Sequence, residues 1–136
     1  MRRRNAISAL MLTLTLLACG SDDGVGPDDA IVGVYDLEMV NGWPLPYLAV
    51  QVEADKVEVV GGAITLNADG TFTDVMTFQI TEAGAVRTED DMYQGTFLKD
   101  GSGATLSPAG YMPYTVSITG STLTLMIGDI PLTYKR

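Results

Sequence analysis

The stretch "ITLNADGTFTDVMTFQIT" (residues 64–81) decides the fold class, because apolar and polar side chains alternate on both sides of an Asp-Gly pair. After the pair, Phe72, Met76 and Phe78 lie on one side of an extended chain and threonines lie on the other. This period of two indicates a strand with one wet face. An Asp-Gly pair between two such runs is typical of a tight hairpin turn. The stretch therefore predicts two neighbouring antiparallel strands.

The same alternation continues along the chain, and no segment after residue 30 has the apolar stripe of a helix. Further tight turns are expected at Asp100-Gly101, in "TGST" (residues 119–122) and in "IGDI" (residues 127–130). The other expected strands are residues 31–40, 47–53, 56–66, 85–89, 92–99, 104–107, 114–119, 121–127 and 130–134. Successive strands joined by tight turns are antiparallel neighbours.

The fold class that follows is all-β, with residues 31–136 as one domain. We expect an antiparallel up-and-down meander closed into a small barrel of about eight strands, since closure leaves no exposed edge. A two-sheet β-sandwich is the alternative, because local hairpin signals do not by themselves establish closure.

The charge of the chain is strongly acidic, with 17 Asp and Glu against 8 Lys and Arg in 136 residues. Three of the basic residues are Arg2, Arg3 and Arg4, so removal of residues 1–18 leaves a formal charge of −12. Such a surface repels phosphate backbones, and we expect no nucleic-acid partner.

Residues 1–18 have the layout of a secretory signal peptide: a cationic start, an apolar run over residues 6–18 and a small residue, Ala18, at the end. A helix of that run would reach about 20 Å, short of the ~30 Å hydrocarbon core, so cleavage is favoured over a transmembrane helix. The ending Leu16-Leu17-Ala18-Cys19 resembles the lipobox of bacterial lipoproteins. That resemblance implies that Cys19 becomes the acylated N-terminal residue and anchors the protein stably in a membrane.

The segment after the anchor is expected to be a flexible acidic linker over residues 19–30. Its four aspartates are not spaced like the ligands of a calcium loop, so we expect no metal there. Gly20 stands where an aspartate would favour inner-membrane retention. The lipoprotein resemblance thus implies the outer membrane, with the protein facing the periplasm or the cell surface.

Four phrases of the barrel domain carry a second resemblance: "GVYDLEMVNGWPLP" (33–46), "GGAITLNADGTF" (61–72), "YQGTF" (93–97) and "GSTLTLMIGDIPLTYKR" (120–136). Together they resemble the small lipocalin-like β-barrel lipoproteins of bacteria. The resemblance implies that Gly33 and Tyr35 open the barrel and that a late cation, Arg136 or Lys135, lies across the Tyr35 ring. Such a cation–π contact is worth ~0.5–2 kcal/mol.

Catalytic chemistry is not expected. The chain has no histidine and one cysteine, which removes Ser-His and Cys-His nucleophile pairs and imidazole metal sites. We therefore predict a protein that is not an enzyme and has no cofactor. The acidic run Glu89-Asp90-Asp91 is interpreted as a turn or a solvated rim.

One residue, Asp74, breaks the apolar face of its strand. An inward carboxylate costs several kcal/mol unless it is paired or neutral. Either Asp74 lies at a rim or bulge and reaches water, or it fixes the polar end of a ligand. In the second case the apolar part of the ligand site is expected to consist of Tyr35, Phe72, Met76, Phe78 and Phe97.

Trp43, which follows an Asn-Gly turn, is expected to plug one end of the barrel or to form a lid or partner contact at its mouth. Two functions remain open. The barrel binds a small apolar ligand, or it is filled by its own side chains and the protein is a structural or interaction protein of the envelope, such as an inhibitor or assembly accessory. An eight-stranded barrel has room only for side chains or one small ligand.

Overall fold

The structure is a computed structural model that describes residues 30–136. The expected signal peptide, the lipidation of Cys19 and the linker up to residue 29 lie outside the described residues. These three features therefore stay predictions.

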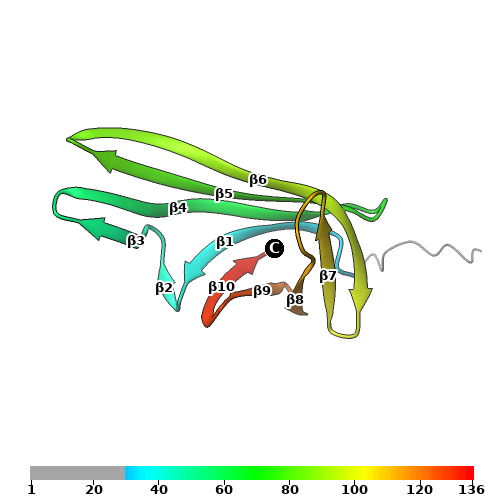
Figure 1. The fold of residues 1–136 in the computed structure, drawn as a ribbon. Helices are drawn as coiled ribbons and strands as arrows, with labels where there is room; N and C mark the ends of the chain where they lie inside the picture. Colours follow the sequence, from blue (N-terminus) through cyan, green and yellow to red (C-terminus); the bar gives the residue numbers. More distant parts are fainter. Residues whose placement is uncertain (1–29) are drawn as a thin grey trace, which may run out of the picture.

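The described chain forms ten strands in one antiparallel sheet (Figure 1). The strands are β1 (Gly33–Val40), β2 (Trp43–Pro44), β3 (Tyr47–Val52), β4 (Asp55–Leu66), β5 (Thr71–Glu82), β6 (Ala85–Asp100), β7 (Gly103–Pro108), β8 (Tyr114–Thr119), β9 (Thr122–Ile127) and β10 (Ile130–Lys135). From β3 to β10 each strand pairs with the next one along the chain, as expected for strands joined by tight turns.

Strand β1 closes the sheet into a barrel. Its first half, Gly33–Asp36, pairs with β4, and its second half, Asp36–Val40, pairs with β10. The ring therefore contains eight strands, β1 and β4 to β10, while β2 and β3 lie outside it. The predicted antiparallel meander closed into an eight-stranded barrel is confirmed, and the sandwich alternative is wrong.

The interior of the barrel is packed by one face of each strand. Ile64, Phe72, Leu106, Leu123 and Tyr134 are at most 1% exposed. Burial of a large apolar side chain of this kind contributes about 1.5–3 kcal/mol. The barrel owes its stability mainly to the packing of these side chains in its interior.

Three strands are longer than the barrel wall and project from it (Figure 1). We call this projection the arm; it consists of β3, residues 55–59 of β4, residues 77–82 of β5 and residues 85–92 of β6. The side chains of β3 and of this part of β6 are mostly exposed. The arm is thus a four-stranded sheet with two open edges.

Strand β6 corrects the expected strand bounds and decides between the two interpretations of its acidic run, the turn and the solvated rim. Residues 85–89 and 92–99 belong to one continuous strand, and Glu89-Asp90-Asp91 is not a turn. The cross-strand partners of the three acids, Phe78, Thr77 and Met76, continue the ladder of β5 without interruption. The acids lie exposed on the free edge of the arm, where water solvates them and no turn is needed.

The first and last strands meet at one end of the barrel, which we call the closed end. The Arg136 guanidinium carbon lies 5.2 Å from the centroid of the Tyr35 ring. Arg136 Nη1 donates hydrogen bonds to the carbonyls of Ala30 (3.1 Å) and Val32 (2.8 Å). Of the two cations considered, Arg136 covers Tyr35, whereas Lys135 lies 3.7 Å from Glu38.

Gly33 is required for this contact. Its φ of +150° is one that other residues rarely adopt, and a Cβ there would lie 2.6 Å from Arg136 Cδ. Tyr35 is fully buried beneath the arginine, and its hydroxyl donates to the Ile31 carbonyl at 2.8 Å. Burial raises the pKa of Tyr35, and the nearby Arg136 charge partly opposes that shift.

We expect Arg136→Ala to lower the free energy of unfolding by about 1–2 kcal/mol, because it removes the cation–π contact and two hydrogen bonds to the backbone. Urea denaturation of the full chain, followed by circular dichroism, measures the change. Lys135→Ala is the matched control and should cost less than about 0.5 kcal/mol, since its ion pair is solvent-exposed. Equal losses in the two variants would contradict the role given to Arg136.

Candidate functional site

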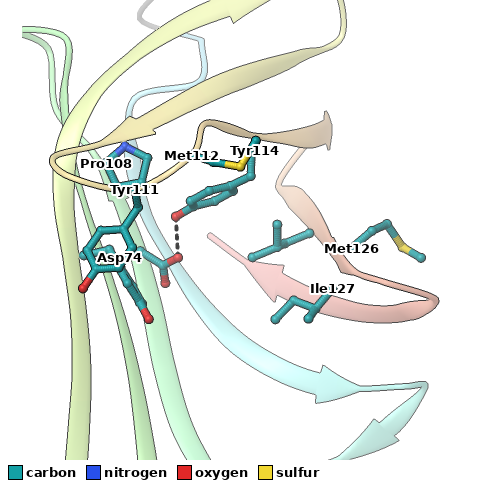
Figure 2. A pocket seen from close by; sticks show the side chains of 9 residues that line it. Asp74, Pro108, Tyr111, Met112, Tyr114, Met126 and Ile127 are labelled. Atoms are coloured by element: carbon teal, nitrogen blue, oxygen red, sulfur yellow. Dashed lines mark hydrogen bonds between the residues drawn. The ribbon is translucent and has the colours of Figure 1, made fainter.

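A cavity of about 290 Å³ opens at the other end of the barrel, which we call the mouth (Figure 2). Tyr114 begins β8 and Ile127 ends β9, and both line the cavity. The opposite end of these strands is the closed end, where the backbone amide of Arg136 donates a hydrogen bond to the Ser121 carbonyl in the β8–β9 turn. The complete lining is Asp74, Tyr93, Pro108, Tyr111, Met112, Tyr114, Leu125, Met126 and Ile127.

Asp74 is the charged group of the cavity. It points inward from β5, between Phe72 and Met76, and is 7% exposed. The Tyr114 hydroxyl donates a hydrogen bond of 2.6 Å to Asp74 Oδ2 (Figure 2). Within residues 30–136, Asp74 Oδ1 has no hydrogen-bond partner and the carboxylate has no ion pair. One carboxylate oxygen is therefore held and the other is available to a ligand.

The surroundings of Asp74 disfavour its charge. Burial raises the pKa of the Asp74 carboxyl, and the hydrogen bond from Tyr114 only partly opposes this effect. Burial and the Asp74 charge in turn raise the pKa values of Tyr114 and Tyr134, so both hydroxyls stay protonated. The Tyr134 hydroxyl is buried and makes no hydrogen bond within the described residues. The site thus contains one buried carboxylate with a single hydrogen bond, whereas the Tyr134 hydroxyl is not among the residues that line the cavity.

Aromatic rings form much of the wall around the acid. Tyr93 and Tyr111 make an edge-to-face pair with centroids 5.1 Å apart, and Phe72 and Tyr114 make another at 6.2 Å. Tyr93 stands directly opposite Asp74 in the β5–β6 ladder. No lysine or arginine is among the lining residues. The cavity is apolar and aromatic, with a single negative group at its base.

The outer rim of the cavity is open. Tyr111 and Met112, on the connection between β7 and β8, are 66% and 87% exposed. Met126 and Ile127, at the end of β9, are about half exposed. Large apolar side chains therefore surround an opening to solvent, as is common for sites that bind small ligands.

The residues that the sequence predicted to form one ligand site lie in different parts of the structure. Asp74 lines the open cavity and is 7% exposed, in a part of β5 that pairs with its neighbours without a bulge. Tyr35, Phe72 and Phe97 are at most 3% exposed and fill the interior. Met76 and Phe78 are partly buried and pack against the core on the side of the arm. None of these five apolar residues lines the cavity at the mouth.

Trp43 does not plug the barrel. It is 67% exposed and lies on β2, outside the closed ring. The short β2 pairs only with the end of β1, and Val40 is the cross-strand partner of Trp43. The expectation of a plug is wrong because β1 passes from β4 to β10 and leaves β2 no place in the barrel wall.

Several residues of the cavity were not identified from the sequence, chiefly Tyr93, Tyr111, Tyr114 and the two methionines. The one available signal was "YMPY" (residues 111–114), where aromatic residues flank a turn before an alternating strand. Tyr114 is 40 positions from Asp74, and the two meet only because the ring closes. Local periodicity contains no information on that contact.

Comparison with known proteins gives no relative: no family model, no curated protein and no solved structure matches the chain. Within residues 30–136, no group of three His, Cys, Asp or Glu side chains is arranged to hold a metal ion. The same part of the chain has no helix that is long and apolar enough to cross a membrane.

The raised pKa of Asp74 predicts a pH-dependent effect of Asp74→Asn on stability. The folded chain holds the Asp74 proton more tightly than the unfolded chain, whose pKa is near 3.8. The wild type should therefore lose stability relative to the variant as the pH rises through 3.8 towards the folded pKa. At pH 7 we expect Asp74→Asn to be the more stable by on the order of 1 kcal/mol, and to show no such advantage at pH 3.

Urea denaturation of the wild type and the variant at both pH values measures this difference. Other carboxylates titrate in the same range but are common to both proteins and cancel in the comparison. An increase in the stability of the wild type relative to the variant with rising pH would show that the fold stabilises the Asp74 charge.

Proposed function

We propose that the chain is a lipid-anchored protein of the cell envelope whose lipocalin-like barrel binds a small, mainly apolar ligand. The observation that carries this proposal is the cavity of about 290 Å³ at the mouth, with a buried acid at its base and apolar side chains around it. The proposed role is binding, with no catalytic step.

The closed end of the barrel supports the lipocalin-like assignment. The sequence resemblance implies a glycine and an aromatic residue on the first strand and a late cation across the ring. Gly33, Tyr35 and Arg136 have this arrangement, with the cation 5.2 Å from the ring centroid. Three residues from the two ends of the domain thus form the contact that the resemblance implies.

The position of Ala30, the first residue that the structure describes, fits a tethered binding protein. Ala30 lies beside Arg136 at the closed end, and the arm projects away from that end (Figure 1). A lipid on Cys19 would hold the barrel by its closed end and leave the mouth accessible. The outer membrane, with the protein facing the periplasm or the surface, remains a proposal that rests on the lipoprotein resemblance alone.

The size of the cavity limits the ligand. Residues of the interior such as Phe72 and Leu106 are almost fully buried, so the ligand binds at the mouth and does not enter the barrel. A volume of about 290 Å³ is at the lower end of the range for ligand pockets. We therefore expect a ligand of one or two rings, or a short aliphatic chain, partly exposed at the rim.

We expect the full chain, held in detergent micelles, to bind the uncharged fluorophore N-phenyl-1-naphthylamine at the mouth. Ile127→Glu should weaken this binding at least ten-fold, because it places a charge in the apolar rim. Val86→Glu is the matched control, because Val86 is 61% exposed on the arm and does not line the mouth cavity. Fluorescence titration, with micelles alone as a blank, measures the affinity. No binding, or equal loss in both variants, would contradict a ligand site at the mouth.

The arm favours the second candidate function, an interaction protein of the envelope. Residues 85–92 of β6 pair only with β5, so one edge of this segment is free. Glu89, Asp90 and Asp91 are exposed there; Arg87 on the same segment pairs with Glu89 at 2.8 Å, so Asp90 and Asp91 carry the uncompensated negative charge. A free edge with negative charge suits an extended basic segment of a partner, which would add a strand to the arm.

A photo-crosslinking amino acid at Thr88, which is exposed within this edge, tests the interaction function in intact cells. We expect one discrete crosslinked partner, lost when the three acids are replaced by Gln, Asn and Asn. The same group at Leu98, which is 77% exposed on the barrel, is the control. A smear of products, or identical products from both positions, would contradict a dedicated edge site.

A further inference from the structure

The mouth cavity combines three chemical features whose joint purpose the barrel itself does not explain. Asp74 is buried with one oxygen unused, and no cation lines the cavity. Tyrosine side chains approach from three separate elements: Tyr93 from β6, Tyr111 from the connection after β7, and Tyr114 from β8.

Each feature favours a positive charge. Buried carboxylates are costly unless a cation or several hydrogen bonds compensate them, and Asp74 has one hydrogen bond. The faces of aromatic rings attract cations within about 6 Å, most strongly where water is excluded. The methionine sulfurs and remaining apolar side chains offer a surface for an organic body but no group for an anion.

We propose that the mouth cavity binds an organic ammonium ion that carries an apolar body. The ammonium group donates to Asp74 Oδ1 and lies among the tyrosine rings, and the body lies against Met112, Met126 and Ile127. This inference rests on the proposed function, because it assigns the ligand class of the same site.

Other ligand classes fit the same cavity less well. A fatty acid or another carboxylate would place a second negative charge beside Asp74, where no lysine or arginine is available. A neutral alcohol can donate to the carboxylate but leaves its charge uncompensated. The acidic surface of the protein, with a net charge of −9 for the whole chain, also raises the local concentration of cations.

A set of three indoles with the same body and different head groups tests the charge preference: tryptamine, tryptophol and indole-3-acetate. Isothermal titration of the full chain in micelles at pH 7 measures the three affinities. We expect tryptamine to bind at least ten-fold more tightly than tryptophol, and indole-3-acetate to bind most weakly. Tryptophol binding as tightly as tryptamine would overturn the inference.

Asp74→Asn removes the charge of the site and keeps its shape. We expect this variant to fold, because the substitution removes a buried charge. We expect it to bind tryptamine at least ten-fold more weakly, with tryptophol within about three-fold of the wild type. Tyr111→Leu should reduce tryptamine affinity several-fold more than tryptophol affinity, since it removes one aromatic face. Trp43→Leu, at an aromatic residue of similar exposure on β2, is the control and should change neither. A tryptamine preference that survives Asp74→Asn would overturn the inference.

The fluorophore titration distinguishes the two levels of failure. If N-phenyl-1-naphthylamine binds and Ile127→Glu weakens its binding at least ten-fold, but the indoles show no preference for the cation, the ammonium inference is wrong and the ligand site stands. If neither the fluorophore nor any indole binds, the proposed function fails and the inference fails with it.

Discussion

The structure depends on the way in which β1 is shared between two neighbours. Its first half completes the sheet against β4 and its second half against β10, so eight strands close without a free edge in the barrel wall. Arg136 fastens this closure by joining the last residue of the chain to the carbonyls of Ala30 and Val32 and to the Tyr35 ring. The mouth cavity, where residues of β5 and β6 meet residues of β8 and β9, exists only because this ring closes.

Closure also explains the arm and the mouth. Because β1 leaves β4 after Asp36, the rest of β4 needs another partner, and β3 supplies it outside the ring. The long strands β5 and β6 continue past the wall in the same way. At the mouth, residues of β8 and β9 face residues of β5 and β6 across the cavity that Asp74 lines.

Much of the fold could be predicted from the sequence because local signals determine it. The Asp-Gly hairpin at residues 69–70 and the later Gly turns fix antiparallel neighbours, and the resemblance added the contact between Tyr35 and a late cation. Strand β6 was divided wrongly because an acidic run resembles a turn, although on a free edge it is simply solvated. Of the candidate site only Asp74 was found, since its partner Tyr114 reaches it only through ring closure.

The two barrels considered at the outset, one that binds a small ligand and one filled by its own side chains, are compatible in one molecule. The closed end is filled, as its fully buried tyrosines and leucines show, and this filling provides the stability. The mouth is not filled, and there the fold tolerates a buried carboxylate with an unused oxygen. A domain of this size gains nothing in stability from such groups, and an apolar residue at position 74 would pack at lower cost. A buried carboxylate with one hydrogen bond, in an open and aromatic-lined cavity, therefore supports the proposed ligand site.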